Sequence, residues 1–227
     1  MDAESGVERF RSQGKKRKTT RVVGVDLAGR SRRNTGICLL HGMTVASFAT
    51  VHSDSEILGF IETARPDLVA IDAPLNLPPG RTSLEDRNGK HFRPCDRELL
   101  KRGIRFFPIT LGPMRALTRR GIRLKEGLLQ QGYAVIEIYP GAAQDVWTIV
   151  RKQGGLPKLR KGLETLGLKG LAKSMNGDEL DAVTGALVGR FYLTGRAEVL
   201  GNIDEGAIVI PRPIQFRPSR EPLPHTG

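Results

Sequence analysis

Two short apolar runs that each end in an aspartate constrain this chain more than any other feature of its 227 residues. The runs are Arg21-Val-Val-Gly-Val-Asp26 and Leu68-Val-Ala-Ile-Asp72. Both contain β-branched residues and are followed by turn-forming residues, so we expect two buried strands. An Asx turn explains either aspartate taken alone. Two aspartates that end two apolar strands favour a shared site instead.

The other periodic segments complete an α/β pattern. Further strands are expected at 35–40, 43–51 and 133–138, and a late short one at 205–210. Helical spacing of apolar residues is found at 54–64, 95–101, 113–131, 142–150, parts of 156–172 and 178–193. This order predicts a mixed five-stranded sheet of order 3-2-1-4-5 with helices on both faces, because two βα crossovers follow a three-strand meander. The predicted topology resembles that of RNase H.

Composition divides the chain into three parts. Residues 1–20 end in Lys15-Lys16-Arg17-Lys18 and predict a flexible basic N-terminal arm. Residues 21–211 are expected to form one RNase H-like domain with a basic insertion at about 75–131, and residues 212–227 a Pro-rich tail.

The charge balance favours a polyanionic partner. Thirty-six Lys and Arg face 24 Asp and Glu, a formal charge of +12, and phosphate contacts give sequence-independent affinity. Charge alone leaves acidic lipid open as well. Cys38 and Cys95 stand apart from other metal ligands, which disfavours zinc sites and disulfides and suits the reducing cytoplasm. Because no apolar run approaches the ~20 residues of a membrane helix, we expect no membrane association.

A second pair of carboxylates lies on the last predicted helix. Asp178 and Asp181 are three residues apart and therefore share one helix face. In the predicted topology this helix crosses the sheet near Asp26 and Asp72, so four carboxylates would converge. Such a cluster is costly without compensation, and hard divalent ions such as Mg²⁺ or Mn²⁺ supply it. Alternatively, Asp178 caps the helix and Asp181 interacts with the helix dipole.

Glu137 is a fifth candidate for the catalytic set. It lies inside the apolar run Val135-Ile-Glu-Ile-Tyr139, where an uncompensated charge facing the core is expensive. It either reaches the site from the neighbouring strand, points to solvent, or pairs with an arginine of the preceding helix.

Ten Lys or Arg and two acids lie between residues 93 and 125. Arginine clamps and aromatic stacking are typical of nucleic-acid binding, whereas two solvated amphipathic helices would show the same charges. We favour core positions for Phe106 and Phe107, and a structural pair between Asp96 and Arg97. A second basic stretch, 151–173, also flanks the expected cleft. The candidate nucleic-acid-binding residues are Arg97, Lys101, Arg102, Arg105, Arg115, Arg119, Arg120 and Arg123.

Several blocks together resemble a family of unknown function whose members are predicted RNase H-like nucleases. The blocks are Gly24-Val-Asp-Leu-Ala-Gly29, Ile71-Asp-Ala-Pro-Leu75, Pro94-Cys-Asp-Arg97, Phe107-Pro108, Leu117-Thr-Arg-Arg-Gly121, Ile136-Glu-Ile-Tyr-Pro-Gly141 and Asp178-Glu-Leu-Asp-Ala182. The last block is also similar to the final helix of RuvC-type Holliday junction resolvases. The resemblance implies a metal site of Asp26, Asp72, Asp178 and Asp181. RuvC-type enzymes have Glu in place of Asp72, and they act as dimers, which leaves a homodimer open.

The sequence therefore predicts a divalent-metal-dependent nuclease that hydrolyses DNA or RNA in the cytoplasm. One alternative is a non-catalytic nucleic-acid-binding RNase H-like protein. Another is a phosphotransferase, because sugar kinases, actin and Hsp70 chaperones share this strand order. Those proteins need two such domains to enclose ATP, and the chain has room for one. It also lacks the P-loop and dinucleotide-binding fingerprints.

Overall fold

The computed structural model describes residues 19–202 and 204–213. The predicted basic arm (1–20) and the Pro-rich tail (212–227) therefore lie almost entirely outside the described residues. None of the described helices is long and apolar enough to cross a membrane.

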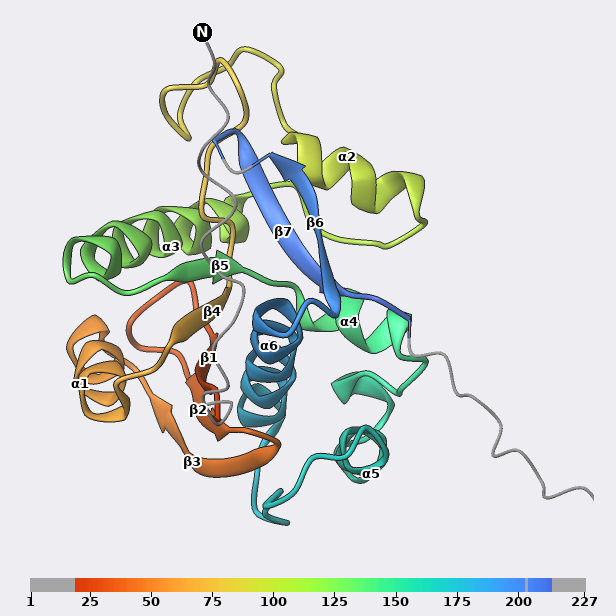
Figure 1. The fold of residues 1–227 in the computed structure, drawn as a ribbon. Coiled ribbons are helices and arrows are strands. Elements are labelled where there is room, and N and C mark those ends of the chain that lie inside the picture. Colours follow the sequence, from red (N-terminus) through yellow and green to blue (C-terminus); the bar gives the residue numbers. More distant parts are fainter. Residues whose placement is uncertain (1–18, 203, 214–227) are drawn as a thin grey trace, which may run out of the picture.

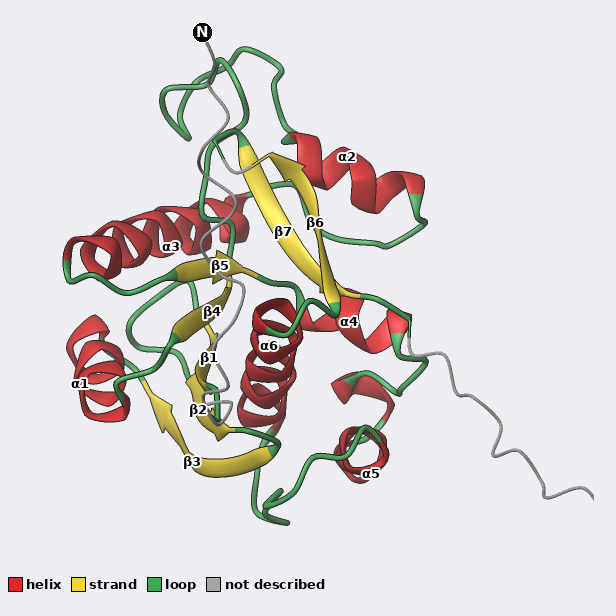
Figure 2. Cartoon of the chain, in the orientation of Figure 1, coloured by secondary structure: helices red, strands yellow, loops and turns green. Residues whose placement is uncertain are grey.

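A mixed sheet forms the centre of the molecule (Figures 1 and 2). Its order is β3-β2-β1-β4-β5, with β1 antiparallel to β2, β2 antiparallel to β3, and β4 parallel to both β1 and β5. This arrangement confirms the predicted RNase H-like topology. The strands are β1 (Arg21–Asp26), β2 (Thr35–His41), β3 (Thr44–Val51), β4 (Leu68–Asp72) and β5 (Val135–Glu137).

Helices cover both faces of this sheet, because side chains alternate between the two faces of each strand. Val23 of β1 and Val69 of β4 face a core built with α1 (Asp54–Ala64) and α3 (Gly112–Gln130). Their sequence neighbours Val22 and Leu68 face the opposite core. There α6 (Gly177–Leu193) lies across the strands, with α4 (Pro140–Val146) and α5 (Leu156–Thr165) beside it.

A third core lies beyond β5, where a hairpin packs on α2 (Pro94–Lys101). The hairpin consists of β6 (Ala197–Asn202) and β7 (Gly206–Pro211). The short strand predicted at 205–210 corresponds to β7, whereas β6 was not predicted. In β6 only Leu200 is buried, so the strand lacks the alternation of apolar and polar residues that sequence analysis detects.

One segment departs from the predicted helices, and a second segment is the long loop that was expected. The helix expected at 142–150 ends at Val146 and is followed by the 3₁₀ turn Lys152–Gly154. The segment between β4 and α2 holds no helix or strand of its own. This loop begins at the carboxyl end of β4, and the turn at Lys152 lies near the carboxyl end of β1.

Candidate metal centre

The two strand-end aspartates are neighbours in the sheet. Asp26 and Asp72 are register partners on the parallel strands β1 and β4. Gly24, two residues before Asp26, faces Ala182 and Ala186 of α6. Because strand side chains alternate, Asp26 and Asp72 point to the same face as Gly24, the face that α6 covers.

Helix α6 begins in a way that leaves its two aspartates available. Asn176 is the N-cap: its side chain accepts a hydrogen bond from the Glu179 backbone N–H at 2.9 Å, and the Glu179 carboxylate accepts one from the Asn176 N–H at 2.9 Å. This capping box occupies the first orphan donors of the helix. The alternative that Asp178 caps the helix is therefore wrong.

Two glycines let α6 approach the strands closely. A Cβ on Gly24 would lie 2.0 Å from the carbonyl oxygen of Ala182, and one on Gly36 would lie 2.1 Å from that of Asp178. No larger residue fits at either position without moving the backbone. The close approach carries Asp178 and Asp181 to the strand ends.

Lys152 shows directly that the carboxylates converge. Its Nζ lies 2.9 Å from Oδ2 of Asp181, 3.0 Å from Oδ1 of Asp178 and 3.3 Å from Oδ2 of Asp26. Three acids from two distant parts of the sequence are thus within reach of one nitrogen. The other oxygen of Asp181 accepts a 2.7 Å hydrogen bond from Nε2 of Gln144 in α4, which orients this carboxylate.

Burial and mutual repulsion act on the two strand-end acids. Burial raises the pKa of Asp26 to about 7, although the adjacent Lys152 opposes the shift. Burial also raises the pKa of Asp72 well above its ordinary value, and the charges of Asp26 and Asp181 raise it further. Within the described chain no hydrogen bond reaches the Asp72 carboxylate. The cluster therefore has more negative charge than one lysine neutralises.

The donor set fits a hard divalent cation. Each donor is a carboxylate oxygen, the ligand type that Mg²⁺ and Mn²⁺ prefer. The ammonium group of Lys152 stands where a cation would bind between Asp26, Asp178 and Asp181. In residues 19–202 and 204–213, no three acid, His or Cys side chains are already arranged around one point as metal ligands. An ion would fit this donor set once Lys152 moved aside.

An open cavity of about 550 Å³ adjoins Asp26, Asp178 and Lys152, and the loop after β1 lines its other side. That loop contributes Arg32 and Arg33, both exposed. Sequence analysis did not single out these arginines or Lys152. The signal available for the loop was the run Arg30-Ser-Arg-Arg33, which begins four residues after the first strand-end aspartate.

Glu137 belongs to a different cluster. It is in register with Ile71, which faces the α1 and α3 core, so it points away from the face that Asp72 occupies. Both of its oxygens accept 2.7 Å hydrogen bonds from the guanidinium of Arg93, and Oε2 also accepts one from the Leu75 N–H. We therefore correct the expectation that Glu137 acts in catalysis. Its partner is Arg93 at the N-cap of α2, not an arginine of the preceding helix.

Arg93 also corrects the predicted pair of Asp96 and Arg97. Its Nη2 lies 2.8 Å from Oδ1 of Asp96, and its Nε lies 3.1 Å from Oδ2. Arg97 is instead exposed. We call the buried group of Arg93, Asp96 and Glu137 the Arg93 triad.

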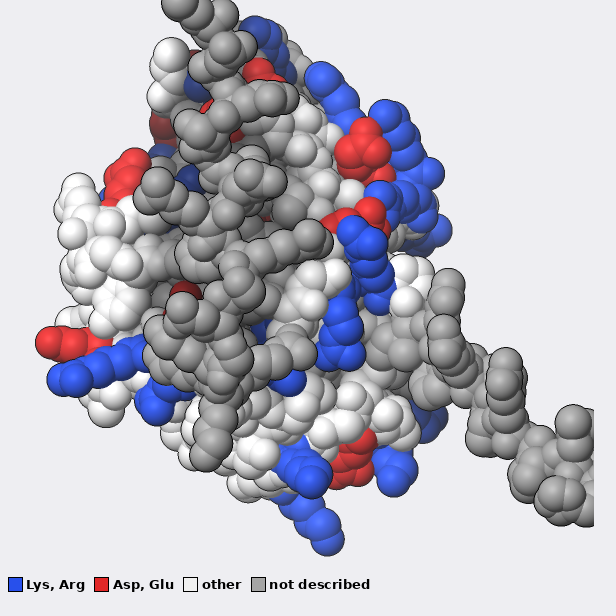
Figure 3. Space-filling model, in the orientation of Figure 1, with Lys and Arg blue, Asp and Glu red and all other residues white. Residues whose placement is uncertain are grey.

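The candidate nucleic-acid-binding residues differ widely in their surroundings. Arg120 is buried and holds three elements together, because it donates to Asp54 at 2.7 Å and to the carbonyl oxygens of Ala28 and His52. Its assignment to nucleic-acid binding is therefore wrong. Three others are engaged on the surface: Lys101 with Glu98, Arg102 with Glu198 and Arg119 with Glu85. Figure 3 shows basic and acidic side chains intermingled along the edge near α2 and β6.

The remaining candidates are more accessible. Arg97, Arg105 and Arg123 are exposed, and none forms an ion pair within the described part of the chain. Arg115 is half-buried and donates to the carbonyl oxygen of Thr110. Three exposed arginines of the predicted set thus stay available to a polyanion.

The prediction that Phe106 and Phe107 are core residues is half right. Phe106 is partly buried against the third core and meets Phe92 edge to face, with ring centroids 6.1 Å apart. Phe107, in contrast, is 71% exposed. The flanking basic residues and Pro108 gave no indication that adjacent phenylalanines would differ.

Comparisons with known proteins identify one family and two similar solved structures. The model of a family described as "Protein of unknown function (DUF429)" matches residues 24–205. No curated protein matches the chain significantly. Among solved structures, the chain is similar to T. thermophilus RuvC in complex with Holliday junction substrate at 14% identity and a TM-score of 0.48, covering 78% of this chain and 96% of that chain. A second Thermus thermophilus RuvC structure matches at 13% identity and a TM-score of 0.44, covering 77% and 96%.

Proposed function

This chain belongs to the DUF429 family, and we propose that it is a divalent-metal-dependent nuclease that hydrolyses phosphodiester bonds of DNA or RNA. The observation that carries the proposal is the convergence of Asp26, Asp178 and Asp181 on one point, with Asp72 beside Asp26 in the sheet. Together these residues would hold Mg²⁺ or Mn²⁺. We also propose a cytoplasmic location, since Cys38 and Cys95 are both free thiols. The homodimer stays a prediction.

Each part of the site has a role in this proposal. The four aspartates supply carboxylate ligands, and Gln144 fixes the orientation of Asp181. Arg32 and Arg33 line the adjoining cavity and would hold the phosphates on either side of the bond to be cut. Bound divalent ions would neutralise the phosphate charge and activate water. Because this water would be the nucleophile, the proposed reaction needs no nucleophilic side chain.

The test is cleavage of labelled single-stranded, duplex, hybrid and branched DNA and RNA in Mg²⁺ and in Mn²⁺. We expect Asp72→Asn and Asp26→Asn to abolish cleavage, a loss of about a thousandfold or more. Binding of substrate should persist in Asp72→Asn, because the change removes a negative charge that repels phosphate. If Asp72→Asn cleaved at the parent rate, Asp72 would have no part in the reaction.

Lys152 favours a second candidate, a non-catalytic nucleic-acid-binding protein. Its ammonium already neutralises part of the cluster at the position of a cation. A protein that keeps Lys152 in place permanently would bind nucleic acid in a salt-sensitive manner, and neither Mg²⁺ nor Mn²⁺ would change its melting temperature.

A further inference from the structure

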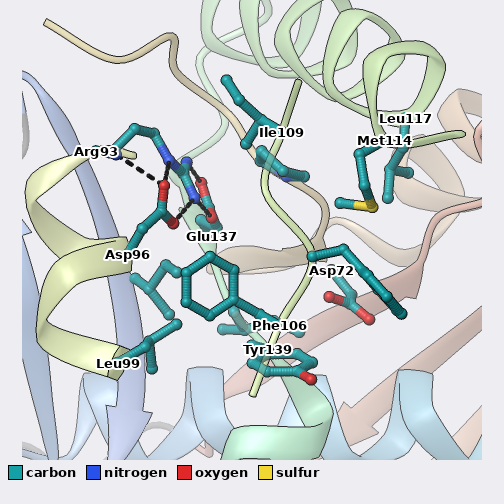
Figure 4. A pocket seen from close by; sticks show the side chains of 14 residues that line it. Asp72, Arg93, Asp96, Leu99, Phe106, Ile109, Met114, Leu117, Glu137 and Tyr139 are labelled. Atoms are coloured by element: carbon teal, nitrogen blue, oxygen red, sulfur yellow. Dashed lines mark hydrogen bonds and ion pairs between the residues drawn. The ribbon is translucent and has the colours of Figure 1, made fainter. Parts of the chain in front are cut away.

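A mostly apolar pocket lies directly beside the candidate metal centre (Figure 4). Asp72 forms one side of it, and the Arg93 triad lies on the other. Between them the walls are aromatic and aliphatic, from Phe106, Phe107, Met114 and Tyr139. The pocket therefore shares one residue with the proposed reaction centre and is otherwise of a different chemical character.

The size of the pocket limits what it can accept. Its volume is about 180 Å³, several times the ~30 Å³ share of one water molecule and below the ~300–1,000 Å³ of pockets that enclose drug-sized ligands. One planar ring system fits such a volume, whereas a complete coenzyme does not. The apolar walls favour the faces of a ring over a charged group.

Phe107 provides a platform for such a ring. It lies at the pocket and is 71% exposed, so most of its apolar surface contacts no described residue. An exposed aromatic ring beside a pocket offers a face on which a nucleic-acid base can stack. The loop that carries it is anchored, because the Tyr139 hydroxyl donates a 2.7 Å hydrogen bond to the carbonyl oxygen of Arg105.

The base of the pocket is held in place as well. The Arg93 triad ties the start of α2 to β5 and, through the Leu75 N–H, to the loop after β4. Exposed Arg105 lies two residues before Phe107. An aromatic pocket with basic surroundings suits a ring that is attached to phosphate.

We infer that this pocket holds one unpaired nucleobase of the polynucleotide, stacked on Phe107, while the adjoining phosphate lies at the carboxylates. The inference rests on the proposed function and specifies its substrate class. A base inside a duplex is stacked and paired, so it could enter only after extrusion from the helix. The protein therefore acts on single-stranded nucleic acid, or on unpaired bases at junctions and ends.

The experiment uses the full-length protein carrying Asp26→Asn in Mg²⁺, so that metal ions can offset the remaining carboxylates while no cleavage occurs. Oligonucleotides contain 2-aminopurine, an adenine analogue whose emission falls when it stacks. We expect the emission to fall when the protein binds the single strand, and duplex of the same sequence to bind at least tenfold more weakly. Phe107→Ala should lose the emission change and about tenfold in affinity for the single strand, whereas Phe107→Tyr should keep both.

The matched control is Leu100→Ala, which removes another exposed apolar side chain, on α2 and outside the pocket lining. It should leave the emission change and affinity unaltered. Equal affinity for duplex and single strand, no binding of the single strand, or unchanged emission with Phe107→Ala would each overturn the inference. If Phe107→Ala behaved like the parent while Asp72→Asn still abolished cleavage, the nuclease proposal would stand without the pocket. If the base stacked on Phe107 but the parent protein cleaved nothing in Mg²⁺ or Mn²⁺, the nucleobase pocket would stand and the nuclease proposal would fail.

Discussion

Two groups of charged side chains differ in how completely their charges are matched: the buried Arg93 triad and the partly exposed carboxylate cluster of Asp26, Asp72, Asp178 and Asp181. In the Arg93 triad, every oxygen of Asp96 and Glu137 accepts a hydrogen bond. In the carboxylate cluster, Asp26, Asp178 and Asp181 contact Lys152, and the fourth acid, Asp72, accepts no hydrogen bond from the described residues. Both groups lie near the carboxyl ends of the parallel strands β1, β4 and β5.

The comparison separates a structural cluster from a functional one by its balance of charge. A matched buried group ties elements together, and removing one member leaves an uncompensated charge. In an unmatched group, repulsion between like charges destabilises the folded protein, and binding of a cation stabilises it. A carboxylate at the end of a strand therefore has opposite consequences in Glu137 and in Asp72.

Arg93→Met should produce the largest loss of stability. It leaves Asp96 and Glu137 buried without a cation, and breaking a buried ion pair from one side costs about 3–5 kcal/mol. The melting temperature should fall by roughly 6–20 °C for a domain of this size. Urea unfolding measures the change in the free energy of unfolding.

The control for Arg93→Met removes all three charges, with Asp96→Asn and Glu137→Gln added. Most of the lost stability should return, because no buried charge then lacks a partner. A loss below about 1 kcal/mol in the single variant would show that the Arg93 triad is no more important than a surface ion pair.

The carboxylate cluster should make the stability of the protein depend on both metal ions and pH. Because the pKa of Asp26 is about 7 in the fold and its ordinary value is 3.8, the folded protein holds the extra proton between these values. The metal-free protein should therefore lose stability as the pH rises through this range. A metal ion competes with that proton, so Mn²⁺ should stabilise more at about pH 8 than at about pH 5.

At a hundred times its dissociation constant, Mn²⁺ should add about 2.7 kcal/mol, a rise of roughly 5–10 °C in melting temperature. Thermal unfolding in Mn²⁺ and in EDTA at both pH values measures this. Asp26→Asn should reduce the pH dependence of the Mn²⁺ effect. An equal rise at the two pH values would contradict the assigned competition between proton and metal.

Lys152→Met should sharpen the contrast further. An incoming ion no longer has to displace the ammonium group, so Mn²⁺ affinity should rise about tenfold, which corresponds to 1.4 kcal/mol. The metal-free protein should be less stable, because Asp26, Asp178 and Asp181 lose their shared partner. Calorimetric titration with Mn²⁺ compares this variant with Lys152→Arg, which keeps the charge. Unchanged or weaker affinity in Lys152→Met would mean that Lys152 does not compete with metal.

Arg102→Ala should have the smallest effect and gives the reference for an exposed pair. The side chains of Arg102 and Glu198 are 39% and 32% exposed, and such pairs contribute about 0.2–1 kcal/mol. A double-mutant cycle with Glu198→Ala measures the interaction. If the interaction energy of this exposed pair equalled that of Arg93 with Glu137, burial would not explain the larger contribution of the Arg93 triad to stability.

The strand order and the four aspartates could be predicted because they are periodic features. Alternation within β1 and β4 places Asp26 and Asp72 on one face, and the i,i+3 spacing places Asp178 and Asp181 on one side of a helix. The RNase H-like topology then brings the two pairs together. Each step uses information that is local in sequence.

Lys152, the Arg93 triad and Phe107 depend on contacts between distant segments. Lys152 is one of seven basic residues at 151–173, and no local pattern distinguishes it from the others. Arg93 meets Glu137 across 44 residues, so its partner could not be inferred from spacing. Adjacent phenylalanines look equivalent in sequence, yet only Phe106 packs on the third core.

The closeness of α6 to the strands at Gly24 and Gly36 has a practical consequence for testing the site. Main-chain atoms, and not the aspartate side chains, set the separation between the strand-borne and helix-borne acids. Replacing one acid by its amide should thus leave the remaining three at their original spacing. Amide variants accordingly report the contribution of a single charge, whereas one added methyl group at position 36 would disturb all four acids together.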